Sequence, residues 1–165
     1  MVVTDELFVR IYEKNKNSVY SVIYNYIRNT ADASDLTQEV FVKLYAYNKE
    51  FESDEHIKAW LIRVAVNLSK NHIRDSRWSS YEELDENLPD REKEDHSDVM
   101  SAVLALPEKY RIPIHLFYYE GWSVKQIADV LGLREPTVKT RLDRGRQKIK
   151  NRLEKEAGHY EYRFI

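Results

Sequence analysis

Residues 121–153 read GWSVKQIADVLGLREPTVKTRLDRGRQKIKNRL, and this stretch decides how the second half of the chain folds. Ser123 followed by Gln126 is a capping-box pattern, which starts a helix. The apolar residues that follow recur at helical spacing and end at Gly132, which can adopt the left-handed conformation that closes a helix. A second helix opens at Glu135-Pro136-Thr137. Two helices joined by a tight glycine turn predict a helix-turn-helix motif.

The second helix of this motif is strongly basic. Between Arg134 and Arg152 there are eight Lys and Arg residues against only Glu135 and Asp143. Lysine and arginine displace counterions from DNA phosphates, and residues near the start of such a helix can reach base edges in the major groove. We therefore expect double-stranded DNA binding. The alternative is a solvated basic helix that packs on its neighbours, and Gly145 disfavours the helix by about 1 kcal/mol relative to Ala.

Residues that lie away from the apolar stripe of this helix are the candidates for DNA contact. The candidates for base edges are Lys139, Thr140, Asp143 and Arg144. The candidates for the sugar-phosphate backbone are Arg141, Arg146 and Lys148, and Arg134 and Thr137 at the helix start complete the predicted DNA-binding set.

The first 78 residues predict three amphipathic helices. Apolar residues recur at three- and four-residue spacing from Val19 to Ile27, from Leu36 to Tyr47 and from Ile57 to Leu68. The polar stretch 48–55 separates the second helix from the third. Short connections between amphipathic helices are typical of a small bundle.

The two helical parts are separated by an acidic segment. Residues 79–97 carry eight Asp and Glu against Arg91 and Lys93, show no sustained apolar period and contain Pro89, so we predict a flexible linker. The expected fold is all-α, with two small helical domains at 1–78 and 98–158 and a tail at 159–165. A net charge of −2 hides this sorting of charge along the chain.

Several classes of protein are disfavoured by composition and pattern. The chain has no cysteine, and its five histidines are not at metal-ligand spacing, so we expect no metal site and no cofactor. Phosphate loops, nucleophile elbows and paired catalytic carboxylates are missing, so we do not expect an enzyme. Neither a signal peptide nor an apolar run of about 18 residues occurs, and we expect a cytoplasmic protein.

Two separate blocks of sequence resemble the sigma-70 family, especially its extracytoplasmic-function group. The segment from Leu106-Pro107 through Thr137-Val138-Lys139-Thr140-Arg141-Leu142 is similar to region 4. Asp35-Leu36-Thr37-Gln38-Glu39-Val40-Phe41 resembles region 2.2, and residues 59–67 resemble regions 2.3 and 2.4. Arg134, Pro136 and Gly145 depart from the family pattern, which usually has Ser, Gly and Ala there. These departures leave the promoter preference open.

The resemblance implies a factor that directs RNA polymerase to −35 and −10 promoter elements and helps to melt DNA. The second domain would bind the −35 element, and the first domain would hold a base flipped from the −10 element. The residues that match the −10 surface are Phe51, Ser53, Asp54, His56, Trp60, Arg63, Asn67, Lys70 and Arg74. Trp60 could equally be buried. The alternative for the basic residues of this helix is a plain solvated face.

The resemblance also implies protein partners. The region 2.2 match would dock on the β′ clamp helices of core RNA polymerase, and the polymerase β flap and an anti-sigma factor are the other implied partners. The matching docking residues are Asp35, Gln38, Glu39, Phe41 and Lys43. Phe41 and Leu44 could instead belong to the bundle core. The alternative reading of the whole chain is a stand-alone helix-turn-helix regulator, which would bind an operator without polymerase.

Overall fold

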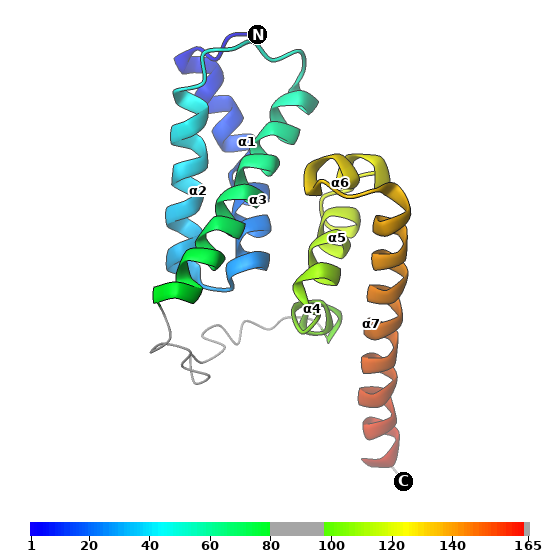
Figure 1. Cartoon of the computed structure of the whole chain (residues 1–165). Coiled ribbons are helices and arrows are strands. Elements are labelled where there is room, and N and C mark those ends of the chain that lie inside the picture. The colour runs from blue at the N-terminus through cyan, green and yellow to red at the C-terminus, as the bar shows by residue number, and fades with distance from the viewer. Residues whose placement is uncertain (80–97, 164–165) are drawn as a thin grey trace.

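A computed structural model describes residues 1–79 and 98–163, and within these ranges every regular element is an α-helix (Figure 1). The helices are α1 (Asp5–Ile27), α2 (Thr30–Tyr45), α3 (Asp54–Ser79), α4 (Asp98–Leu104), α5 (Glu108–Tyr118), α6 (Val124–Leu131) and α7 (Glu135–Arg163). The predicted all-α fold with two helical domains is confirmed. Residues 80–97, most of the predicted linker, lie outside the described residues.

Local side-chain and backbone chemistry fixes the ends of the first-domain helices. The Thr4 hydroxyl accepts a hydrogen bond from the backbone N–H of Leu7 and caps the start of α1. Arg28 ends α1 in a left-handed conformation with φ of 58°. The Asn29 side chain then accepts from the backbone N–H of Asp32 and starts α2. This tight connection makes α1 and α2 neighbours along their length (Figure 1).

The helix-turn-helix forms as its sequence pattern predicts. The Ser123 hydroxyl accepts from the backbone N–H of Gln126, and the Gln126 side chain accepts from the backbone N–H of Ser123, which completes the capping box. Gly132 takes the left-handed conformation, with φ of 65°, at the end of α6. Helix α7 begins at Glu135 and continues through the predicted tail as far as Arg163.

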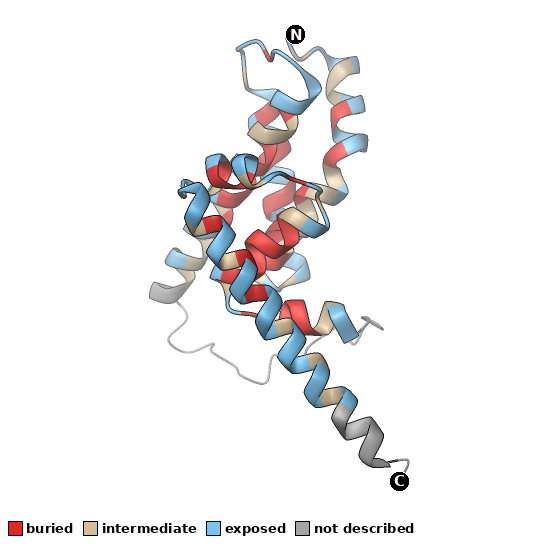
Figure 2. Cartoon of the chain, turned by 90° about the vertical axis from the view of Figure 1, so that its right-hand side faces the viewer, coloured by how far each residue is buried: buried red, intermediate tan, exposed pale blue. Residues whose placement is uncertain are grey.

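The two domains pack directly against each other. Helix α1 packs on α2 and α3 within the first domain, and α5 packs on α6 and α7 within the second. Across the boundary, α1 contacts α5 and α3 contacts α6, so one core of buried apolar side chains extends through both domains (Figure 2). Most of α7 presents an exposed outer face to the solvent (Figure 2).

Candidate nucleic-acid and polymerase interfaces

The outer face of α7 meets the start of α5 at a cationic cavity. Val138, Leu142 and Gly145 are buried on the inner side of α7, which leaves Thr140 and Arg144 on the exposed side. A cavity of about 360 Å³ opens between the two helices. Its lining residues are Lys109, Tyr110, Pro136, Thr137, Thr140, Arg141 and Arg144.

Basic side chains surround the ring of Tyr110 beside this cavity. The Lys109 and Lys148 Nζ atoms lie 5.0 Å and 5.7 Å from the centroid of the Tyr110 ring. Burial acts to raise the pKa of Tyr110, but hydrogen bonds and positive charge from Lys109 and Arg144 outweigh it and lower the pKa. The positive charge concentrated here suits a DNA phosphate. Lys109 was missed by the sequence analysis because it lies outside the basic run of α7.

Other predicted DNA-binding residues of the second domain lie elsewhere. Arg146 pairs with Asp143 on α7 and donates a hydrogen bond to the Tyr118 hydroxyl at 3.0 Å, so both members of this pair have a protein partner. Arg134 and Lys139 are exposed at the start of α7. Arg141 is half-buried. Its positive charge acts to lower the pKa of Tyr26 on α1 in the first domain, against the larger effect of burial, which raises that pKa.

Helix α3 presents one continuous polar stripe. Arg63, Asn67, Lys70 and Arg74 are all exposed and follow one another at three- and four-residue spacing, so they share a face of the helix. Arg74 also lies 3.4 Å from the Asp75 carboxylate. Three cations and one amide in a row fit the path of a nucleic-acid strand.

An aromatic cluster stands at the beginning of this stripe. The Trp60 ring centroid lies 4.9 Å from that of Tyr47 and 5.8 Å from that of Phe51, and Trp60 is half-buried. Phe51 is only 1% exposed, so the prediction that it contacts DNA needs correction: its ring is enclosed by Tyr47, His56 and Trp60. Phe51 is therefore the buried member of this aromatic cluster and packs against Tyr47 and Trp60.

Hydrogen bonds and a long ion pair hold the loop that leads into α3. The backbone N–H of Glu52 donates to Nδ1 of His56 at 3.1 Å, and the backbone N–H of His56 donates to the Ser53 hydroxyl at 3.1 Å. Asp54 lies 3.8 Å from Lys14 of α1, with both side chains largely exposed. His56 and Ser53 are therefore held in place while remaining exposed.

Helix α2 has a clear inner and outer side. Phe41 and Leu44 are both buried, so Phe41 is not part of an open docking surface: its ring packs edge-on against Phe8 and Tyr12 of α1. The exposed residues predicted for docking are Asp35, Gln38, Glu39 and Lys43. Val42 and Tyr45 are also exposed, at 67% and 64%, and extend this surface. Large exposed apolar side chains beside polar ones are typical of a protein-binding surface.

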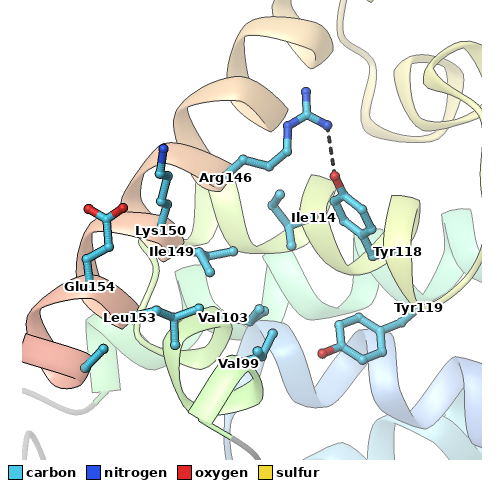
Figure 3. A pocket seen from close by; sticks show the side chains of 11 residues that line it. Val99, Val103, Ile114, Tyr118, Tyr119, Arg146, Ile149, Lys150, Leu153 and Glu154 are labelled. Atoms are coloured by element: carbon cyan, nitrogen blue, oxygen red, sulfur yellow. Dashed lines mark hydrogen bonds between the residues drawn. The ribbon is translucent and has the colours of Figure 1, made fainter. Parts of the chain in front are cut away.

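A second surface with apolar character lies between α4, α5 and α7 (Figure 3). The groove has a volume of about 570 Å³ and is lined on its apolar side by Val99, Val103, Ile149 and Leu153. Arg146, Lys150 and Glu154 stand along α7 beside it, and the Arg146–Tyr118 hydrogen bond crosses one end (Figure 3). An apolar groove with charged edges fits an amphipathic helix.

The described residues contain neither a grouping of metal ligands nor a helix suited to a membrane. Within 1–79 and 98–163, no three or more His, Cys, Asp or Glu side chains are grouped so that they could hold a metal ion. Likewise, none of the helices in these ranges is long and apolar enough to cross a membrane.

Comparison with known proteins gives a consistent result for both domains. Residues 11–79 match sigma-70 region 2, and residues 96–149 match sigma-70 region 4. The ECF RNA polymerase sigma factor SigW of Bacillus subtilis is 28% identical over 169 residues, which cover 90% of this chain and 89% of the relative.

Two solved structures share the fold. The sigma factor RpoE in complex with the anti-sigma factor NepR from Bartonella quintana aligns with a TM-score of 0.69 and 21% identity, over 89% of this chain and 96% of that chain. CnrH in complex with the cytosolic domain of CnrY aligns with a TM-score of 0.66 and 21% identity, over 92% of this chain and 90% of that chain.

Proposed function

The chain belongs to the extracytoplasmic-function group of the sigma-70 family, which directs RNA polymerase to promoters, and we propose that its two domains divide promoter recognition between them. The second domain binds the −35 element and the first domain binds the −10 element. The chain itself catalyses no reaction in this role, and it acts where the polymerase acts, in the cytoplasm.

For the −35 element, we propose that the exposed side of α7 enters the major groove. Lys139, Thr140 and Arg144 are exposed and face away from the buried stripe, so they are placed to reach base edges or phosphates. Lys109 at the start of α5 adds a phosphate contact at the cationic cavity. Asp143 and Arg146 hold each other, and we assign them a supporting role.

For the −10 element, we propose that the α3 stripe holds the melted strand. Arg63, Lys70 and Arg74 would contact phosphates, and Asn67 is placed to bond a base or sugar. A base that is taken out of the duplex loses stacking interactions worth a few kcal/mol, so the binding site must provide contacts that replace them. Trp60 and His56 at the start of the stripe offer aromatic surface for that purpose.

For polymerase, we propose two docking surfaces, one on each domain. The outer side of α2 (Gln38, Glu39, Val42 and Tyr45) would bind the β′ clamp helices. The apolar groove between α4, α5 and α7 would accept an amphipathic segment of the β flap. Because RpoE from Bartonella quintana was solved with an anti-sigma factor, we also propose an anti-sigma partner for this chain.

The observation that carries the proposal is that one chain presents two separate surfaces suited to nucleic acid, on α3 and on α7. It is tested with core RNA polymerase and a promoter carrying both elements. Arg144→Ala and Lys109→Ala should weaken protection of the −35 element while polymerase binding is retained. Asn67→Ala should leave −35 protection intact and reduce permanganate reactivity of melted thymines near −10.

Matched controls make the assignment falsifiable. Lys155→Ala removes an exposed cation of α7 outside the cationic cavity and should change neither footprint. Loss of polymerase binding in Arg144→Ala would show that the DNA-reading side of α7 is misassigned. Reduced −35 protection in Asn67→Ala would contradict the division between the domains.

A further inference from the structure

The first residues of the chain lie beside the loop that leads from α2 to α3 (Figure 1). The backbone nitrogen of Met1 donates to the carbonyl oxygen of Phe51 at 2.6 Å, and the backbone N–H of Phe51 donates to the carbonyl oxygen of Met1 at 3.0 Å. Two residues that exchange both bonds in this way are paired as in an antiparallel sheet. They are 50 positions apart in the sequence, so the pairing is a tertiary contact.

Phe51 is the point at which this loop is attached to the domain. It is only 1% exposed, whereas residues 48–50 and 52–56 are all exposed. Its ring packs against Tyr47 and Trp60, with centroids 4.9 Å and 5.8 Å away. The aromatic cluster therefore fixes the ring of Phe51 while Met1 fixes its backbone, and the two constraints together set the position of the loop.

Residues 1–4 form a short N-terminal brace between this loop and α1. At one end of the brace, the Thr4 hydroxyl caps the start of α1. At the other end, Met1 pairs with Phe51. Val3, between the two ends, is half-buried and packs against the core. Removing two residues from the brace would take away about 7 Å of reach, so the shortened chain could not hold both ends at once.

The braced loop is directly connected to the two aromatic residues that we propose to contact the flipped base. The ring of Phe51 lies edge-on to the rings of His56 and Trp60, with centroids 5.2 Å and 5.8 Å away. The backbone N–H of Glu52, the next residue along the chain, donates to Nδ1 of His56 at 3.1 Å. A displacement of Phe51 would therefore change the packing of Trp60 and the hydrogen bond that orients His56.

A binding site for an unpaired base gains affinity when the site is formed before the base arrives. A loop that becomes ordered only on binding loses conformational freedom at that step, and its affinity for the ligand falls accordingly. In the described part of the chain, the backbone of the loop 46–53 bonds to α2, to α3 and, beyond these, only to Met1. The pairing with Met1 thus orders the loop in the free protein.

We propose that the N-terminal brace positions the loop for recognition of the −10 element, because the backbone of Met1 holds Phe51 and, through it, Trp60 and His56. This inference deepens the proposed function and rests on it, whereas the pairing of Met1 with Phe51 is a property of the free protein. The brace acts through its backbone and its length. The side chain of Val2, which is 54% exposed, has no part in it.

Amide hydrogen exchange of the free protein, followed residue by residue by NMR, tests the pairing. The Phe51 N–H should be protected in the parent. Deletion of Val2 and Val3 keeps a methionine before Thr4 but shortens the brace, so exchange at Phe51 should become at least about tenfold faster. Deletion of Val2 alone keeps Val3 and should change the rate in the same direction. An unprotected Phe51 N–H in the parent, or an unchanged rate in both deletions, would overturn the pairing.

Val2→Ala and Val3→Ala are the matched controls, because they remove side chains and keep the length of the brace. Exchange at Phe51 should stay within about twofold of the parent in both. Far-ultraviolet dichroism and the affinity for core polymerase check that the deletion variants keep their helices and their docking surface. Acceleration in Val3→Ala equal to that in the deletion of Val2 and Val3 would assign the effect to side-chain packing and overturn the role of the backbone.

Binding of single-stranded −10 DNA by the chain assembled with core polymerase tests the consequence of the pairing. The probes are fluorescent strands from the promoter used above, one intact and the others each lacking one base. The parent should bind the intact strand more tightly than the strand without the flipped base. Deletion of Val2 and Val3 should weaken binding of the intact strand at least about fivefold and leave binding of that abasic strand unchanged. Equal weakening for every strand would indicate a general structural defect and overturn the positioning role.

The two measurements separate this inference from the proposed function. If the parent shows no preference among the strands, the proposed −10 site fails, while a protected Phe51 N–H that depends on the length of the brace leaves the pairing in place. If the parent shows the preference and the deletion of Val2 and Val3 retains it despite rapid exchange at Phe51, the proposed function stands and the positioning role is overturned.

Discussion

Gly145 lies where α7 crosses α5. A Cβ atom at this position would lie 2.8 Å from Cγ1 and 3.1 Å from Cδ1 of Ile114, so the two helices approach more closely than alanine allows. The residue is buried. The close approach explains why a residue that disfavours the helix by about 1 kcal/mol is used here.

Gly145→Ala should therefore destabilise the protein. Overpacking costs about 1–3 kcal/mol and exceeds the gain in helix propensity, so we expect a net loss of about 1 kcal/mol in the free energy of unfolding. In an Ile114→Ala background the same change should instead stabilise the fold. Urea denaturation of the four proteins in this double-mutant cycle measures both values. The same sign in both backgrounds would contradict the packing explanation.

Glu120 makes the contact between domains sensitive to acid. Burial acts to raise its pKa, but hydrogen bonds from His115 and Ser18 and positive charge from His115 and Lys58 outweigh it and lower the pKa. Its pKa in the folded protein lies below the ordinary value of 4.5, so its ionised form contributes stability that is present above that pH and is lost as the pH falls through the folded-state pKa. The stability difference between the parent and Glu120→Gln should be largest at pH 6 and should shrink below about pH 4.5. Thermal unfolding across this range measures it. A difference that does not change with pH would exclude the ion pairs as its source.

At the scale of single residues, local chemistry was predictable and tertiary partners were not. The Ser123–Gln126 capping box and the left-handed Gly132 depend on neighbours within a few positions, and both are confirmed. The burial of Phe41 depends on Phe8 and Tyr12 of another helix. The hydrogen bond that Arg146 donates to Tyr118 joins residues that are 28 positions apart in sequence.

At the scale of elements, the outer side of α2 is the surface that we predict to bind core polymerase. Tyr45 and Val42 are exposed next to Gln38 and Glu39, and aromatic residues often dominate the affinity of protein interfaces. Tyr45→Ala should reduce the affinity for core polymerase about tenfold or more, with little change in helix content. Competition against labelled parent protein measures this affinity.

The control for this surface is Glu6→Ala, an exposed residue of α1 outside it, which should bind polymerase like the parent. Normal affinity in both Tyr45→Ala and a Gln38→Ala variant would remove the assignment of α2 to polymerase. The apolar period of α2 predicted its inner side, but an exposed Val and Tyr could be identified only from the packed bundle.

The α3 stripe could be predicted in part from the spacing of its residues. Arg63, Asn67, Lys70 and Arg74 recur at helical spacing, so their common face follows from the sequence once the helix is assigned. The aromatic cluster at its start needs the loop before α3 to fold back on the helix. This brings Tyr47 and Phe51 to Trp60.

At the scale of the whole molecule, the sequence predicted two domains but not their direct packing. Arg111 and Glu120 each lie in a helical or turn segment where an exposed position would be ordinary, and only the three-dimensional structure shows that they contact α1 and α3. The overall charge of −2 is equally uninformative, because the acidic residues of 79–97 offset the basic face of α7.

The central claim is that this chain directs RNA polymerase to promoters through two DNA elements. The most direct test is transcription of genomic DNA fragments by core RNA polymerase with and without the protein, followed by sequencing of transcript 5′ ends. We predict new start sites that share two spaced upstream elements and that are lost with Arg144→Ala. No new starts, combined with tight unaided binding to duplex DNA, would contradict the claim and indicate a stand-alone regulator.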